Sequence, residues 1–221
     1  MAMNNREKVT TWLIEALPGS EIEASLLAEG FTRPGKSLVY LRRGAEIMQY
    51  FKLTFDAGPR YEPTALAHVL PGVILESAIL AELVRQMTEG APELAGWVEP
   101  SVVVGHQLQN LAPKDLHQQA TRWFIHGEAE TSGILQQIGA FAQRWAIPFL
   151  NEYRGIPSLI QGYEAGDERL RLGRHLYLAA AYLHVGEPAK GLEFLEGVFR
   201  RPAHRKQYAK AFEYLRRKGA S

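Results

Sequence analysis

The residue pattern with the clearest chemical potential is a short glycine-rich segment near the N-terminus. Residues 30–37 are Gly-Phe-Thr-Arg-Pro-Gly-Lys-Ser, which matches the phosphate-binding pattern G-x-x-x-x-G-K-[ST]. In nucleotide-binding proteins such a segment joins a buried strand to a helix, whose first amides surround the phosphates together with the lysine and the hydroxyl. A nucleotide-binding enzyme is therefore one hypothesis for this chain, and its candidate residues are Gly30, Gly35, Lys36 and Ser37.

The residues on either side of this segment favour a different interpretation. Before it, Ser20 and Glu23 have the spacing of a helix capping box, so Gly30 falls where a helix would end. After it, residues 38–41 (Leu-Val-Tyr-Leu) are typical of a strand. We therefore expect a turn into a hairpin with strands near 37–42 and 46–56, and we interpret the phosphate-binding match as coincidental. A helix directly after Ser37 would reverse this interpretation.

Other catalytic and metal-binding patterns are missing from the sequence. Its seven histidines form no H-E-x-x-H motif, its serines lie in no G-x-S-x-G motif, and it contains no cysteine. We expect no catalytic residue, no metal site and no cofactor. A catalytic pair assembled from positions far apart in the chain stays open at this stage.

Periodicity along the chain predicts an α+β fold. Helices are expected at 6–17, capped by Asn4 and Glu7, at the segment after Ser20, and after Ser77; further strands are expected near 64–70, 101–106 and 120–126. From Glu128 onward the pattern is helical, with Asp167 as a helix N-cap, Gly186 as a helix stop and a last helix after Pro202. The expected architecture is a small, mostly antiparallel sheet packed with N-terminal helices, followed by a C-terminal helical bundle. The α+β part (1–127) and the helical part (128–221) are expected to share one core as a single domain, because no flexible linker separates them.

The bulk composition limits the environment and the partners. The chain has 221 residues, 46% of them hydrophobic, and a formal net charge of +1. We expect no signal peptide, and because the sequence has no apolar run of membrane-spanning length we expect a cytoplasmic protein with no membrane partner. Basic residues cluster at 200–206 and 216–218, which keeps a nucleic-acid-associated module as an alternative. The near-zero net charge, and the helix dipole that the last cluster would compensate, argue against nucleic acid as a partner.

Three side chains are candidates for contact with a partner protein. Trp97 lies in a loop rich in glycine and proline, where an exposed ring would serve as a contact residue; the alternative is a ring packed over the sheet. Arg42 and Arg43 form a basic pair on the predicted hairpin. The other tryptophans, Trp12, Trp123 and Trp145, fall in apolar stripes and are expected in the core.

Three fragments together resemble a known family. Residues 26–35 (Leu-Leu-Ala-Glu-Gly-Phe, then Gly35) lead into the predicted strand pair; residues 108–111 (Leu-Gln-Asn-Leu) precede Trp-Phe-Ile at 123–125 and a helix; residues 146–150 are Ala-Ile-Pro-Phe-Leu. This order resembles an uncharacterised bacterial family, the domain of unknown function numbered 4304, over about residues 20–165. The resemblance implies a small α+β domain and carries over no reaction and no catalytic residue.

The leading hypothesis from the sequence is a non-enzymatic protein-binding domain of bacterial type. Some compact bacterial domains of this general kind are immunity proteins, so the expected partner is another protein, for example a toxin. The identity of the partner and the oligomeric state are left open.

Overall fold

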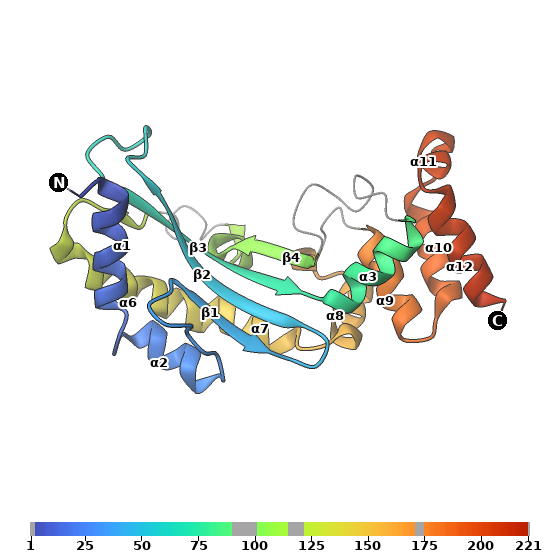
Figure 1. Cartoon of the computed structure of the whole chain (residues 1–221), viewed down its shortest axis with the longest axis horizontal. Coiled ribbons are helices and arrows are strands. Elements are labelled where there is room, and N and C mark those ends of the chain that lie inside the picture. Colours follow the sequence, from blue (N-terminus) through green and yellow to red (C-terminus); the bar gives the residue numbers. More distant parts are fainter. Residues whose placement is uncertain (1–2, 90–100, 115–121, 171–174, 221) are drawn as a thin grey trace. The chain divides into compact units, whose positions relative to one another are not determined.

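The chain combines a small antiparallel sheet with many helices, which confirms the predicted α+β class. The computed structural model describes residues 3–89, 101–114, 122–170 and 175–220 (Figure 1). Within these residues, no helix is both long enough and apolar enough to cross a lipid bilayer.

The elements follow one another in an order close to the prediction. The strands are β1 (Val39–Arg43), β2 (Met48–Ala57), β3 (Ala67–Glu76), β4 (Val102–Gln107) and β5 (Phe124–Ile125). The α-helices are α1 (Asn5–Ala16), α2 (Glu21–Ala28), α3 (Ala78–Met87), α6 (Thr131–Phe141), α7 (Ile147–Glu152), α8 (Ile156–Glu164), α9 (His175–His184), α10 (Pro188–Val198), α11 (Pro202–Gln207) and α12 (Ala209–Gly219). Short 3₁₀ turns are η1 (Leu108–Leu111), η3 (Glu128–Glu130) and η5 (Glu168–Leu170), and a π-helical turn, η4 (Ala142–Ala146), links α6 to α7.

The sheet has the strand order β1-β2-β3-β4, and β5 pairs with β3. The predicted hairpin is confirmed: β1 and β2 are antiparallel, with Val39 opposite Lys52 and Leu41 opposite Tyr50. The third strand is longer than predicted, because it continues through Pro71 and Gly72 to Glu76. The strand predicted at 120–126 is reduced to β5, and residues 120–121 lie outside the described part of the chain.

The chain forms two compact units whose boundaries fall within β3 and β4. Unit 1 comprises Met1–Gly44, Met48–Ile74 and Gly105–Glu152, and unit 2 comprises Ala45–Ile47, Leu75–Val104 and Tyr153–Ser221. The predicted division after residue 127 does not coincide with these borders, and the single shared core stays a prediction.

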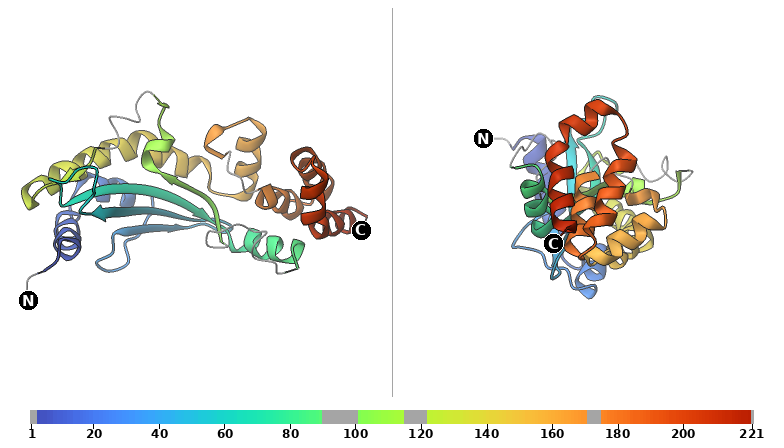
Figure 2. Two further views of the ribbon diagram at one scale, coloured as in Figure 1. Left: turned by 90° about the horizontal axis from the view of Figure 1, so that it is seen from above. Right: turned by 90° about the vertical axis from the view of Figure 1, so that its right-hand side faces the viewer.

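In unit 1, helices cover one side of the sheet. Figure 2 (left view) shows α6 and α7 running along that side, and α1 and α2 both pack against α6. Local signals set where the first two helices begin. The Asn4 side chain accepts from the Glu7 amide in a full capping box, and the Ser20 hydroxyl caps α2 at the Glu23 amide, as predicted.

In unit 2, helices pack on one another. The helix predicted after Ser77 is confirmed as α3, which the Ser77 side chain caps, and α10 packs against both α9 and α12. Gly186, with a φ of +81°, ends α9 as predicted, and Pro188 begins α10.

The carboxylate of Asp167 accepts from the amide and the guanidinium of Arg169 in the short turn η5. Residues 171–174, which lie between η5 and α9, are outside the described part of the chain, so the cap predicted for the longer helix stays a prediction. The predicted last helix is divided at Tyr208 into α11 and α12.

The tryptophans occupy less uniform positions than predicted. Trp123 is 3% exposed and belongs to the core. Trp12 and Trp145 are only partly buried, so the expectation that both lie in the core is wrong. Trp97 lies outside the described residues.

Candidate protein-binding face

The segment that matches the phosphate-binding pattern has the geometry of a helix end and a turn. Gly30 follows α2 with a φ of +81°, and Gly35 has a φ of +55°. The amides of residues 30–32 donate to backbone carbonyls, and the Ser37 hydroxyl accepts from the Val39 amide at 3.0 Å. The chain then enters β1. The strand predicted after Ser37 is therefore confirmed, and the loop lacks the outward amides of a helix start that a phosphate site requires.

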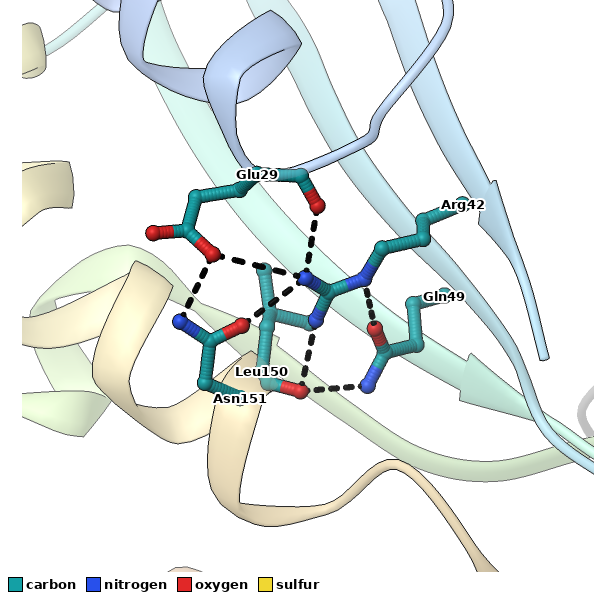
Figure 3. A network of polar contacts seen from close by, with 5 residues as sticks. All are labelled: Glu29, Arg42, Gln49, Leu150 and Asn151. Carbon is teal, nitrogen blue, oxygen red and sulfur yellow. Dashed lines mark hydrogen bonds and ion pairs between the residues drawn. The ribbon is translucent and has the colours of Figure 1, made fainter.

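Arg42 lies inside unit 1 and is not a surface contact. The residue is 8% exposed, and its guanidinium is held by groups from α2, β2 and α7 (Figure 3). The distances are 2.7 Å to Gln49 Oε1, 2.9 Å to the Glu29 carbonyl, 2.8 Å to Asn151 Oδ1 and 2.9 Å to the Leu150 carbonyl. The prediction that Arg42 contacts a partner is wrong, because a buried cation needs these acceptors to offset its lost hydration.

The same network explains the glycine and phenylalanine that follow α2. Phe31 is 2% exposed, and the Arg42 guanidinium lies 4.5 Å from the centre of its ring. The turn at Gly30 redirects the chain after α2, so that the next residue, Phe31, points into the core. The residues that match a nucleotide motif therefore help to build the core of unit 1.

Arg43 lies on the other side of the strand. Successive side chains of a strand point to opposite faces, so Tyr40 and Arg42 face the helices while Leu41 and Arg43 face away from them. Arg43 is exposed, and it pairs in register with Met48. Among the described residues, no carboxylate lies within ion-pair distance of Arg43.

The sheet surface that includes Arg43 is here named the open face. It comprises the side chains of β1, β2 and β3 that alternate with the buried ones. Its members in unit 1 are Val39, Leu41, Arg43, Met48, Tyr50, Lys52, Thr54, Asp56, Leu70 and Ile74; His68 lies on the same side of β3 but is buried.

The open face is more apolar than a solvated sheet face usually is. Antiparallel sheets with one face in water normally alternate apolar and polar residues, the polar ones pointing outward. Here six of the outward residues are apolar or aromatic and only partly buried: Val39, Leu41, Met48, Tyr50, Leu70 and Ile74. Apolar side chains gathered on a surface and edged by charges are typical of protein-binding sites.

An aromatic cluster lies at one end of the open face. Tyr61, in the loop after β2, is 62% exposed, and its hydroxyl lies 2.7 Å from Nδ1 of the buried His68. The His68 ring packs on Phe124 with centroids 4.6 Å apart. Partial burial and the nearby Asp56 carboxylate raise the pKa of Tyr61, so its hydroxyl stays protonated at neutral pH. An exposed tyrosine held in place by neighbours is a frequent energetic centre of interfaces.

The histidines that the structure describes belong to no cluster of metal ligands. Across the described ranges, no three His, Asp or Glu side chains gather closely enough to hold a metal ion. His126 Nδ1 lies 3.1 Å from Glu130, and His184 Nε2 lies 2.8 Å from Glu46. These are single pairs, and such pairs stabilise loops and helix ends.

One cavity in unit 2 is small and mainly apolar, and its volume can be compared with that of known ligand sites. It holds about 50 Å³ and is lined mainly by apolar side chains of β4, α3, α8, α9 and α10. The half-buried His175 is its main ionisable group, and burial lowers the pKa of this imidazole. Sites for small-molecule ligands usually enclose at least about 300 Å³. The cavity is therefore too small for a substrate-sized molecule.

Comparison with known proteins identifies no relative of this chain. Neither the models of protein families, nor the curated proteins, nor the solved structures include a match to this chain. The resemblance to the bacterial family 4304 stays a prediction, and the argument for function depends on the geometry of the open face.

Sequence reasoning found one residue of this face and missed the rest. Arg43 was a predicted contact, whereas Tyr50, Tyr61 and the apolar residues around them were not. The signal was present in the alternation of β2, where residues 48, 50 and 52 (Met, Tyr, Lys) all lie out of phase with the buried Phe51 and Leu53.

Proposed function

We propose that this chain is a non-enzymatic protein-binding domain whose open face binds a partner protein. The observation that supports the proposal is the row of partly exposed apolar side chains on β1, β2 and β3 that alternate with the buried ones. Burying them against a partner would remove apolar surface from water, which is the main favourable term in most protein associations.

The charges at the edge of the face define the chemistry of the partner. Arg43 lies at the end of β1, and Lys52 lies 4.9 Å from the centre of the Tyr50 ring. Two cations beside an apolar centre fit a surface that presents an apolar patch and carboxylates next to it. A protein toxin neutralised by an immunity protein is one partner of this kind, and the resemblance to a bacterial family agrees with that role.

The experiment compares capture by matched variants. Tagged wild-type protein, Arg43→Glu and Leu41→Glu are incubated with native lysate, and Lys8→Glu serves as the control because Lys8 is exposed on α1. A captured protein is identified by mass spectrometry, purified, and titrated against each variant by calorimetry. We expect one stoichiometric partner that binds the wild type and the control equally and binds both open-face variants at least ~10-fold more weakly, the equivalent of about 1.4 kcal/mol.

Two results would contradict the proposal. One is a partner that binds the Arg43→Glu and Leu41→Glu variants as tightly as the wild type, since its site would then lie elsewhere. The other is the absence of any stoichiometric partner. Arg43→Glu changes only an exposed side chain, so it remains informative even if Leu41→Glu fails to fold.

A further inference from the structure

The basic residues of this chain are concentrated at its C-terminal end, a fact that the net charge of +1 conceals. Residues 197–221 contain eight Lys and Arg but one Glu, a net charge of +7. The preceding 196 residues contain 17 Lys and Arg and 23 Asp and Glu, a net charge of −6. An anionic partner responds to the local field rather than to the total charge. The small net charge of the whole chain therefore does not exclude the binding of nucleic acid to this segment.

Much of this charge lies on the surface of unit 2. Every residue of α11 is exposed, as are the two arginines before it (Figure 1). Segment 200–206 is here named the basic patch. Its cations, which have no carboxylate within ion-pair distance among the described residues, are Arg200, Arg201, Arg205 and Lys206.

The neighbouring basic residues have different surroundings. Lys210 pairs with Glu89, and Arg216 lies 3.3 Å from Glu196. These pairs neutralise part of the charge on α12, whereas the four cations of the basic patch have no such pair among the described residues.

Two stacked aromatic side chains flank the basic patch. Phe199 and Tyr208, which flank it, stack with centroids 4.2 Å apart and planes inclined by 7°. Arg205 Nε donates to the Phe199 carbonyl at 3.1 Å, and Arg200 Nε donates to the Gly197 carbonyl at 2.9 Å. Each of these bonds uses one of the five guanidinium N–H donors, so the Nη donors remain for an anion.

We infer that the basic patch binds the phosphate backbone of a single-stranded nucleic acid. Three of its four cations are arginines, whose planar donors suit phosphate oxygens. The partly exposed Tyr208 ring borders the patch, and on α12, outside the patch, the partly exposed Tyr214 ring lies 5.3 Å from Arg217. Cations interleaved with aromatic rings are the composition of single-strand binding surfaces, because bases stack on the rings while the phosphates meet the cations.

The test measures how the binding of a fluorescent 20-nucleotide single-stranded RNA depends on salt. The full chain is titrated by anisotropy between low and physiological salt, and log K should fall linearly with log[salt]. The test variant is Arg201→Gln with Lys206→Gln, and the control is Lys8→Gln with Lys36→Gln. Both pairs remove two exposed cations, so the net charge changes equally while the location of the lost charge differs.

We expect the test variant to bind more weakly and to lose about 1.4 from the magnitude of the salt slope, at about 0.7 per lost phosphate contact. The control should retain the wild-type slope and affinity. Equal losses in the two variants, or no binding at low salt, would overturn the inference. Competition by poly-glutamate of equal charge as effective as that by unlabelled RNA would also overturn it and point to an acidic protein, and stronger competition by anionic phosphatidylserine vesicles would point to a membrane surface.

Discussion

Two adjacent arginines show how strongly position within a strand decides the role of a residue. Arg42 and Arg43 are neighbours in β1, yet one is enclosed by acceptors and the other lies on the open face. The two-residue period of a strand places them on opposite sides of the sheet. Only the acceptors from α2, β2 and α7 make the burial of Arg42 tolerable, and they come from positions up to 109 residues away.

We predict that Arg42→Ala lowers the free energy of unfolding by about 3–5 kcal/mol, because it leaves buried acceptors without a donor and removes the ring contact with Phe31. Arg43→Ala, which truncates an exposed side chain, should change it by no more than about 0.5 kcal/mol. Urea unfolding followed by circular dichroism measures both. Similar losses in the two variants would show that the Arg42 network contributes little.

A second prediction concerns Glu46 in unit 2. Its carboxylate accepts from the Ile156 amide at 3.0 Å and lies 2.8 Å from His184 Nε2. The bond from the Ile156 amide, followed by that from His184, lowers the pKa of Glu46. A carboxyl group whose pKa is lower in the folded state stabilises the fold above its unfolded pKa, and this contribution disappears as the pH falls through the folded pKa.

Glu46→Gln should therefore be less stable than the wild type at neutral pH. Because the unfolded pKa of glutamate is about 4.3, the difference should shrink once the pH falls below that value. Urea unfolding at several pH values between 7 and 3 gives the difference directly. A difference that stayed constant over this range would mean that the charge of Glu46 is not what stabilises the contact.

At the scale of elements, the α9–α10 hairpin depends on a close approach of two helices. A Cβ at Gly191 would lie 2.9 Å from the Ala179 carbonyl and 3.4 Å from the Tyr182 Cβ. Gly197, in the same helix α10, has nothing within 4 Å of the corresponding position. Position 191 therefore has no room for a side chain, whereas position 197 does.

We predict effects of opposite sign for alanine at these two sites. Gly191→Ala should lower the free energy of unfolding by about 1–3 kcal/mol, because the added methyl group overlaps the α9 backbone. Gly197→Ala should raise it by about 0.5–1 kcal/mol, because alanine is the better helix former. Thermal unfolding of the two variants side by side distinguishes them, and stabilisation by Gly191→Ala would show that the helices separate freely.

Local signals in the sequence predicted many element boundaries and failed where distant residues intervene. The caps at Asn4 and Ser20 and the stop at Gly186 depend on atoms a few residues away, and the structure confirms them. The third strand was cut short in the prediction because Pro71-Gly72 usually breaks a strand. The chain continues there, and a Cβ at Gly72 would lie 2.8 Å from the His106 carbonyl, so this glycine permits a close approach of β4 that the local pattern does not reveal.

At the scale of the whole molecule, each compact unit has a surface that could serve recognition. Unit 1 has the open face, where apolar side chains lie beside cations, and unit 2 has the basic patch. Sequence reasoning identified the class of fold, Arg43 of the open face and the basic residues of the basic patch. It did not identify the open face, because the helices that decide which alternate residues of β1 and β2 are buried include α6 and α7, which are distant in sequence.

The most direct test of the open face is site-specific photo-cross-linking in the native cell. The photoreactive amino acid p-benzoylphenylalanine replaces Tyr50 in one strain and Leu27, a 49% exposed residue of α2, in another. We predict that irradiation links the Tyr50 position to a single partner protein and leaves the Leu27 position without that adduct. Equal adducts at the two positions, or an adduct at Leu27 alone, would contradict the account.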